Sequence, residues 1–338
     1  MFKPKLSLLP KIVLRIESDD TNFTPNENIP VEFHHLFIAA AGAFFTQDDH
    51  ATILCQTLKL NEFSLWTHEI FALDPIMLIS KPCRDIFALH FMASSSIRAE
   101  TKKKNKGPFM MNGREVNLFK LKGITHKTPL YDIEHLFSFH INITPEGLAK
   151  LAEKHPELQI LAGKKIEPGS GPVNAQPYKM NPICQDIINR ICQCKHVEQA
   201  GIVYLNRCCL NLYINFANQD KQGVQPMRVY SKEIETALPA ALEYLSTNLS
   251  ETYSLAKMAY LLDVNAQALE AAFESTYFIT PETYRWYCKM EFAFLSAVTS
   301  NTPPEDIAQQ IGMSDLNEFI GAFNDYYNYS FFSLRNAQ

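Results

Sequence analysis

Four cysteines lie close together near the middle of the chain, at Cys192, Cys194, Cys208 and Cys209. Thiolates gathered in this way could ligate zinc or take part in redox chemistry. On a helix, however, a C-x-C pair directs its two thiols about 200° apart, because each residue turns the helix by about 100°. Zinc sites commonly place roughly two to four residues between paired cysteines. We therefore expect these cysteines to pack as small core residues, with a thiol redox sensor as the alternative.

The ten histidines are the other residues with obvious chemistry. Cupin enzymes hold a metal ion with an H-x-H pair, a following glutamate and a later histidine, and the chain has no such pattern. His135 and His140 are five residues apart, so in a strand they point to opposite faces. We expect the histidines to be hydrogen-bonded or solvated. The sequence also lacks a Walker loop, a G-x-S-x-G elbow, an H-E-x-x-H pair and a G-x-G-x-x-G loop, so it predicts no enzyme, no cofactor and no metal site.

Composition indicates an ordinary globular protein. The 338 residues are 46% apolar and 20% charged, which is typical of a soluble chain of two or three domains. No apolar run is long enough to cross a bilayer, and the start MFKPKLSLLPKIVLRI lacks the apolar core and cleavage site of a signal peptide. The cysteines are then expected to be reduced. We expect a cytoplasmic protein with no membrane contact.

The first part of the chain has the pattern of strands. Its short runs rich in aromatic and β-branched residues are VEFHHLFIAAAGAFF, TILCQTLKL, FSLWTHEIFAL, DIFALHFMA, EVNLFKL and HLFSFHINI. Clusters of Asp, Pro, Asn, Gly or Ser separate them, which predicts an antiparallel β-sandwich or barrel. The charged segment Thr101–Pro108 is expected to be a solvated loop between two of these strands.

Helices are predicted after this region. Thr144 and Pro145 have the types of an N-cap and a first helical residue. Apolar residues at helical spacing then predict two helices, near 182–194 and 197–217. The polar run NQDKQGVQP follows them and is expected to be a hinge.

The final segment begins with a helix-turn-helix pattern. Apolar stripes at 255–262 and 269–273 flank the short run DVN. Asp263 suits a left-handed conformation in that turn, and Asn265 suits the N-cap of the helix that follows. Thr280 and Pro281 then start a long helix.

A second helix-turn-helix pattern follows the long helix. Thr302–Glu305 predicts a capping box, with apolar residues of the next helix directed inward. Gly312 supplies the positive φ of the turn, and Ser314 is the expected N-cap of the last helix. Two such units joined by one long helix form a specific arrangement.

This segment resembles the C-terminal domain of the AraC/XylS family of bacterial transcription regulators. The resemblance covers about Ile234 to Arg335, and from Tyr284 onward the family pattern fits without a gap. The matching positions are Leu255, Ala259, Leu269, Phe273, Pro281, Tyr284, Ala293, Ile307, Ala308, Gly312, Phe319, Ala322, Phe323 and Arg335. A single helix-turn-helix stripe would be weak support, whereas both turns with the linking helix are specific.

The resemblance implies an α+β protein in three parts. A β-rich, cupin-like domain for sensing and dimerisation is expected at 1–175, a helical pair with a hinge at 176–230, and an all-α dual helix-turn-helix DNA-binding domain at 231–338. The implied function is a sequence-specific DNA-binding transcription regulator controlled by a small-molecule effector. Its expected partners are double-stranded DNA, the effector and a second copy in a homodimer, with RNA polymerase as a further candidate.

The same resemblance points to site residues. The base-reading candidates are Asn265, Gln267, Glu270 and Ala271 on the first recognition helix, and Leu316, Asn317, Glu318 and Gly321 on the second. Amides can pair with adenine edges, and carboxylates can accept a hydrogen bond from cytosine N4. The candidates for phosphate contacts are Lys257, Arg285 and Lys289. Those for the effector pocket are Phe37, Trp66, Phe91 and Phe137, with core packing as their alternative.

The charge of the final segment conflicts with DNA binding. The whole chain has a net charge of −5, but residues 231–338, with fourteen acids and five bases, carry −9. Asp315, Glu318 and Asp325 lie on the stretch that should meet a polyanion, whereas phosphate neutralisation dominates DNA affinity.

The long helix departs from the family as well. It has Phe292, Phe294 and Leu295 where the family has basic residues, and a helix that is apolar nearly all round is normally buried. Tyr277 and Asn328 stand where the family usually has glycine. The alternative function is therefore a degenerate helix-turn-helix protein that has lost DNA binding and acts through protein–protein interaction.

Overall fold

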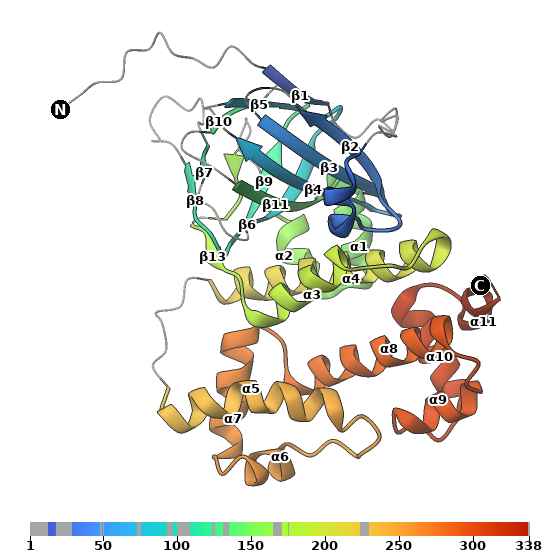
Figure 1. Cartoon of the computed structure of the whole chain (residues 1–338). Coiled ribbons are helices and arrows are strands. Elements are labelled where there is room, and N and C mark those ends of the chain that lie inside the picture. Colours follow the sequence, from blue (N-terminus) through green and yellow to red (C-terminus); the bar gives the residue numbers. More distant parts are fainter. Residues whose placement is uncertain are drawn as a thin grey trace. The chain divides into compact units, whose positions relative to one another are not determined.

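The chain forms two compact units (Figure 1). The computed structural model describes residues 13–17, 29–47, 49, 51–72, 76–92, 97–99, 109–123, 126–130, 135–164, 171–174, 176–223 and 230–336. The β unit comprises the described residues within Met1–Met180 and Asn189–Cys194, and the helical unit comprises those within Asn181–Ile188 and Lys195–Gln338.

The β unit is built on an eight-stranded antiparallel sheet. In spatial order it contains β12 (Gly171–Pro172), β9 (Glu115–Leu121), β6 (Ile86–Met92), β11 (His135–Ile143), β4 (Phe63–Ala72), β3 (Ala51–Lys59) and β2 (Gly42–Gln47), with β13 (Tyr178–Lys179) paired to β9. A smaller sheet contains β1 (Val13–Glu17), β5 (Ile76–Lys81) and β10 (His126–Leu130). Strands β7 (Ile97–Ala99) and β8 (Phe109–Met111) pair with each other.

One face of the large sheet packs against the smaller sheet. The buried cluster between them includes Ile53, Cys55, Met92 and Leu136 from the large sheet and Leu130 from β10. The residues that alternate with these along the strands point to the opposite face of the large sheet. They form a second buried layer there, which includes Leu54, Leu89 and Phe139. The α+β class and the antiparallel sandwich are confirmed for the described residues, and the parallel pairing of β1 with β5 is an exception to the antiparallel pattern.

The first predicted strand is wrong in part. Val31–Leu36 forms a 3-10 helix, η1, and only Gly42–Gln47 of this region is extended. None of the η1 residues is buried, so packing does not favour an extended chain there. The sequence pattern also does not predict β10, which contains Pro129 and lies at a sheet edge, the place in a sheet where proline is tolerated. The charged segment Thr101–Pro108 lies outside the described residues.

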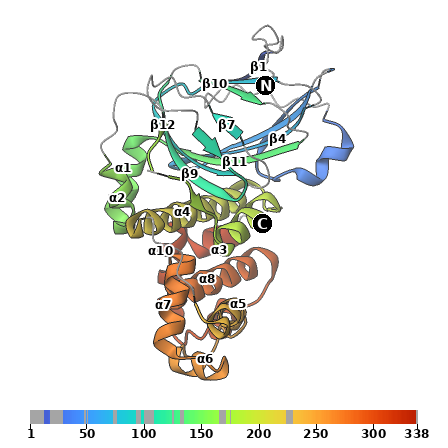
Figure 2. The same ribbon diagram turned by 90° about the vertical axis from the view of Figure 1, so that its left-hand side faces the viewer.

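Helices complete both units (Figure 2). The β unit contains α1 (Pro145–Lys154), η2 (Pro156–Leu158) and α2 (Gln159–Ala162), and α3 (Pro182–Cys192) spans residues of both units. The helical unit contains α4 (Glu198–Gln222), α5 (Lys232–Thr247), α6 (Leu255–Leu261), α7 (Ala266–Tyr277), α8 (Pro281–Thr299), α9 (Pro304–Gln310), α10 (Leu316–Tyr327) and α11 (Phe331–Arg335). Helix α4 continues to Gln222, so residues 218–222 of the predicted hinge are helical, and residues 224–226 lie outside the described residues.

The helical unit contains one supersecondary motif twice. Helices α6 and α9 each have 7 residues, and α7 and α10 each have 12. Both turns contain a left-handed residue, Asp263 with φ 53° and Gly312 with φ 72°. In both, an alanine carbonyl of the first helix accepts a hydrogen bond from the turn, from Val264 to Ala259 at 3.0 Å and from Met313 to Ala308 at 2.8 Å. Two helix-turn-helix units joined by α8 are therefore present.

Helix termini confirm some of the predicted caps and correct others. Thr144, Asn265 and Thr280 are N-caps as predicted. The N-cap of α10 is Asp315 instead of Ser314, and α9 begins after Pro303 without a side-chain cap.

The C-terminal ends of α7 and α10 carry left-handed residues other than glycine. Phe278 has φ 59° and Asn328 has φ 48°. The first left-handed residue therefore comes one position after Tyr277, which remains inside α7. Asparagine adopts this conformation more readily than an aromatic residue does.

The linking helix α8 is buried on one side only. Its buried residues are Pro281, Arg285, Met290, Ala293, Phe294 and Ala297. Leu295, in contrast, is 39% exposed, so the apolar composition does not place the whole helix in a core. In the part of the chain that the structure describes, no helix is long and apolar enough to cross a membrane.

Candidate nucleic-acid interface

The N-terminal ends of α7 and α10 occupy equivalent places in the two units. Residues at the start of the second helix of such a unit are the ones that reach base edges in DNA. Of the eight sequence candidates, Asn265, Gln267, Ala271, Asn317, Glu318 and Gly321 are exposed, and Glu270 and Leu316 are half-buried. The structure therefore exposes three candidates on each helix and leaves one on each half-buried.

Two of the residues at these ends cap the helices. Asn265 Oδ1 accepts a hydrogen bond from the Ala268 N–H at 3.0 Å, and Asp315 Oδ1 accepts one from the Glu318 N–H at 2.8 Å. A carboxylate at this place satisfies an orphan donor and lies at the positive end of the helix dipole. Asp315 is therefore acidic for a reason that lies within the fold.

The same explanation applies to half of the acids in this segment. Seven of its fourteen acids stand at an N-cap or in a first helical turn: Glu233, Glu235, Glu282, Glu305, Asp306, Asp315 and Glu318. Acids in these places stabilise helices through the helix dipole. Half of the acids of this segment thus stand where they stabilise helix N-termini.

Gly321 leaves a gap on the exposed side of α10. A Cβ built at this position would meet no atom within 4 Å. Asn317 and Glu318 lie one turn earlier on the same face. Bare backbone beside two polar side chains allows a close approach by a ligand.

Arg285 does not belong to this exposed surface. It is 7% exposed, and its Nη2 donates to the carbonyls of Asn248 and Leu249, both at 3.0 Å, and to that of Glu251. These carbonyls follow α5, so Arg285 ties that loop to α8. Burial lowers the pKa of the guanidinium. The expectation that Arg285 contacts phosphate is corrected, because its donors are engaged with the main chain.

The two lysine candidates differ in exposure. Lys257 is exposed, and its Nζ lies 2.6 Å from Glu251 Oε2. The hydrogen bond raises the pKa of Lys257 and lowers that of Glu251. Lys289 is half-buried, and burial, with the charge of Arg285, lowers its pKa. Among the three phosphate candidates, Lys257 is the one at the surface, and a carboxylate already shares its charge.

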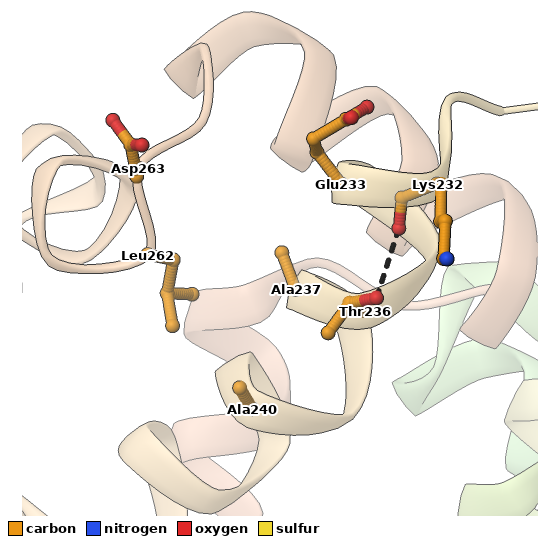
Figure 3. A pocket seen from close by; sticks show the side chains of 7 residues that line it. All are labelled: Lys232, Glu233, Thr236, Ala237, Ala240, Leu262 and Asp263. Carbon is orange, nitrogen blue, oxygen red and sulfur yellow. Dashed lines mark hydrogen bonds between the residues drawn. The ribbon is translucent and has the colours of Figure 1, made fainter.

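An open pocket of about 390 Å³ adjoins the first helix-turn-helix unit (Figure 3). It is lined by Lys232, Glu233, Thr236, Ala237, Ala240, Leu262 and Asp263. Ala237, Ala240 and Leu262 contribute apolar side chains to it, and Lys232, Glu233 and Asp263 contribute charged groups of both signs. The left-handed turn residue Asp263 therefore borders this pocket as well as the recognition helix.

The effector-pocket candidates do not share one face of the large sheet. Phe137 and Phe91 lie on the face of Phe139, because Phe91 pairs with Phe139 and Phe137 is two residues away from it. Trp66 pairs with His140 and therefore lies on the opposite face. Phe37 follows η1 and contacts the ring of His34. A single pocket in this sheet cannot include both Trp66 and the Phe91–Phe137 pair.

A row of histidines lies on the Trp66 face, which also contributes to the core against the smaller sheet. His68 Nε2 lies 3.0 Å from His140 Nε2, and His90 pairs with His140 across the strands. Burial, together with the neighbouring rings, lowers the pKa of His68, and it lowers that of His90 to about 3. The His68 and His90 imidazoles are therefore neutral at pH 7.

Hydrogen bonds give this row a direction. Asn142 Oδ1 accepts from His140 Nδ1 at 2.9 Å, so His140 Nε2 must accept from His68 Nε2. His68 Nδ1 then accepts from the Cys55 thiol at 3.1 Å, and burial raises the pKa of that thiol to about 12. Motif searches miss this row, and the signal that could reveal it is the alternation of polar residues along β4 and β11.

The clustered cysteines pack as the sequence predicts. Cys194, Cys208 and Cys209 are buried, and Cys192 is half-buried. Burial raises the pKa of Cys192 to about 12 and that of Cys209 well above its ordinary value. Protonated thiols are poor nucleophiles and metal ligands.

The chain is similar to solved structures of AraC-type transcription regulators. No protein-family model and no curated protein matches it. The C-terminal domain of the response regulator yesN from Fusobacterium nucleatum is 26% identical over 31% of this chain and 99% of that domain, with a TM-score of 0.27. A regulator with an AraC-type DNA-binding domain from Chromobacterium violaceum is 20% identical over 30% of this chain and 91% of that chain, with a TM-score of 0.29. ToxT from Vibrio cholerae is 11% identical over 81% of this chain and 98% of that chain, with a TM-score of 0.31.

Proposed function

We propose that the protein is a transcription regulator of the AraC/XylS type that binds DNA through both helix-turn-helix units. The observation that carries this proposal is the repetition of one motif at α6–α7 and α9–α10, with equal helix lengths and a left-handed residue in each turn. Both copies expose hydrogen-bonding side chains at the start of the second helix, Gln267 in one and Asn317 in the other. Each recognition helix would enter one of two successive major-groove segments.

Base edges would contribute more than phosphates to this recognition. Amides bind adenine edges and carboxylates accept from cytosine, so Gln267, Asn317 and Glu318 suit direct readout. Of the three phosphate candidates, Arg285 is hydrogen-bonded inside the fold and Lys257 is paired with Glu251, so few of them are available to the phosphates of DNA. Because each neutralised phosphate contributes about −0.9 to the slope of log K against log salt, we expect a shallow salt dependence.

The β unit is proposed to bind a small-molecule effector and to form the homodimer. The polar row of His68, His90 and His140 beside Trp66 supports the effector role, because it places hydrogen-bonding groups, together with Ser138 and Asn142, on a sheet face that also carries buried apolar residues. RNA polymerase is a proposed further partner of the DNA-bound protein, and the cytoplasm is its proposed location. The functional division at 1–175, 176–230 and 231–338 is part of the same proposal.

Fluorescence anisotropy of the full chain tests DNA binding. The probes are random-sequence duplexes and duplexes from the region upstream of its own gene, measured over a salt series. Tighter binding to one upstream duplex, with a slope of about −2 to −3, is the expected result for few phosphate contacts per site. Absence of binding to every duplex at low salt would overturn the proposal and favour the degenerate, protein-binding alternative.

A further inference from the structure

One face of α4 carries a row of polar side chains. Tyr204, Arg207, Asn211, Asn215, Asn218 and Gln222 recur at intervals of three and four residues. Residues at that spacing lie on one side of a helix. Helix α4 belongs to the helical unit, as do α7, α8 and α10, which this row contacts.

The second half of the row binds the C-terminal end of α7. Asn215 Nδ2 donates to the Tyr277 carbonyl at 2.7 Å, and Asn218 Nδ2 donates to the Phe278 carbonyl at 2.9 Å. The last carbonyls of a helix have no partner within it, so these amides satisfy orphan acceptors. Phe278 is held at φ 59°, an unfavourable conformation for an aromatic residue, and the bond from Asn218 secures it there.

Asn215 is itself fixed from its other side. Its Oδ1 accepts from Asn181 Nδ2 at 2.9 Å, and it is 2% exposed. Both ends of the amide are therefore satisfied, and the amide cannot turn away from α7 without losing a buried hydrogen bond.

The first half of the row binds the C-terminal end of α10. Arg207 Nη1 donates to the Tyr326 carbonyl at 3.1 Å, and the guanidinium lies 3.6 Å from the centre of the Tyr326 ring. Asn211 Nδ2 also donates to the Tyr326 hydroxyl at 3.1 Å. A cation at the negative end of a helix dipole, stacked on an aromatic ring, is favourable on both counts.

The row also contacts the linking helix between these two ends. The Tyr204 hydroxyl donates to Glu291 Oε1 at 2.8 Å, and the Tyr204 ring lies 5.2 Å from the Phe294 ring. Helix α4 therefore touches both recognition helices and the helix that joins them. It leaves the N-terminal ends of α7 and α10 exposed.

We propose that α4 is a strut that fixes the two recognition helices relative to each other and so sets the half-site spacing that the protein accepts on DNA. Arg207 and Asn218 are its positioning residues. They are eleven residues apart, so a rigid helix holds the two C-terminal ends about 17 Å apart along its axis. The half-site part rests on the proposed DNA binding, whereas the fixed geometry can be measured without DNA.

The test compares Arg207→Met and Asn218→Ala with a matched control, all in the full chain. Arg207→Met removes the charge and the hydrogen bond but keeps an unbranched side chain, and Asn218→Ala removes one bond at the other end. Lys221→Ala is the control, because Lys221 is exposed on the same helix. The DNA probe is a duplex pool with a randomised central segment, from which the half-sites and their preferred separation are read. The second readout is the distance between spin labels on non-natural residues at positions 267 and 317, measured by pulsed EPR.

The expected result is a loss of spacing preference without a loss of half-site binding. Affinity for one half-site stays unchanged, while the preference for the best separation falls about threefold to tenfold, the effect of one hydrogen bond. The distance distribution widens in both variants and stays narrow in Lys221→Ala. If Arg207→Met and Asn218→Ala show the same distance distributions and the same spacing preferences as Lys221→Ala, the proposal that α4 fixes the two helices is wrong.

Failure of the strut and failure of DNA binding give different results. If no chain binds the pool, the proposed function fails, and the distance distributions alone decide whether α4 fixes the helices. If Arg207→Met does not fold, Asn218→Ala decides, because Asn218 is only half-buried and makes one of several bonds at that end.

Discussion

Gly312 lies against the main chain of Ser250, where a Cβ on Gly312 would stand 2.4 Å from the Ser250 carbonyl oxygen. Gly312 also has φ 72°, a conformation that costs little only for glycine. Ser250 lies between two of the residues whose carbonyls accept hydrogen bonds from Arg285. The turn of the second helix-turn-helix unit and Arg285 therefore hold the same loop, which leads into the first unit.

Gly312→Ala is expected to destabilise the helical unit. The clash is with backbone, which cannot move aside as a side chain can, so we expect a loss of about 2 kcal/mol or more in the free energy of unfolding. Urea denaturation followed by circular dichroism measures it. Gly321→Ala is the matched control, because its Cβ meets open space and alanine favours the helix by about 1 kcal/mol. Equal stability of the two variants would show that the Gly312 contact is not tight.

Arg285→Ala is expected to lower stability and not merely DNA affinity. It leaves three carbonyls of one loop without their charged donor, and hydrogen bonds to charged groups contribute about 1.5–3 kcal/mol each. Thermal unfolding of the full chain is the measurement. An unchanged melting temperature, together with a DNA affinity that depends less steeply on salt, would instead show that Arg285 contacts phosphate.

Glu251→Gln is expected to strengthen DNA binding. The substitution removes the carboxylate that now neutralises Lys257, and the ammonium becomes available to a phosphate. Affinity should rise at low salt, and the slope of log K against log salt should steepen by about one unit. The double variant with Lys257→Ala is the control and should lose this gain. A gain that persists in the double variant would point to general charge reduction.

Asp315→Asn and Asp315→Ala separate the two roles of one acid. Asparagine keeps the N-cap acceptor, so stability should hold, whereas alanine should cost about 1 kcal/mol. Both remove a negative charge from the start of α10 and should bind random-sequence DNA more tightly than the unmodified chain. Anisotropy and urea denaturation on the same samples provide the comparison. Weaker DNA binding by Asp315→Asn at full stability would assign the carboxylate to base contacts.

Gln267→Ala and Asn317→Ala are expected to relax sequence preference while leaving the fold intact. Both side chains are exposed, so the melting temperature should change little. Each lost base contact should reduce discrimination at one position by about 1–3 kcal/mol. Selection from a randomised duplex pool identifies the positions. A uniform loss across all sequences would instead indicate phosphate contacts.

The stability of the β unit is expected to fall as pH decreases. Burial lowers the pKa of His90 from its ordinary value of 6.5 to about 3 in the folded chain. The contribution of His90 to the free energy of unfolding is therefore fully present above about pH 7 and is lost as the pH falls from 6.5 to 3. The loss is at most about 1.4 kcal/mol per pH unit, and it is smaller for a half-buried ring. Thermal unfolding at several pH values should show a weaker dependence for His90→Asn. If the variant and the unmodified chain depend on pH in the same way, His90 does not cause the loss of stability at low pH.

Local patterns in the sequence predict much of the helical unit. Its turns, N-caps and apolar stripes depend on neighbours a few positions apart, so the sequence predicts them. Examples are the turns at Asp263 and Gly312 and the N-caps Asn265 and Thr280. The β unit is predicted less completely. Strands β5 and β10 depend on pairing with distant segments. Pro129 argues against a strand at β10 in the sequence, because a sheet tolerates proline mainly at its edge.

The candidate site shows the same division. Sequence places Gln267 and Asn317 at the starts of exposed helices, because helix periodicity fixes which residues share a face. It assigns Arg285 to phosphate by analogy, whereas the fold directs that guanidinium at three carbonyls from a loop more than thirty residues earlier. It also gives no sign that Asp315 serves as a cap in place of Ser314.

The sequence by itself determined the repeated helix-turn-helix motif, the acidic charge of its segment and the antiparallel β-rich character of the first part, since each follows from short-range pattern or composition. Only the tertiary structure decided which charges are available, which histidines meet across the sheet and that α4 joins both recognition helices. Those depend on residues that are distant in the chain and adjacent in space. Burial and hydrogen bonding act on that adjacency, and no periodicity along the chain encodes it.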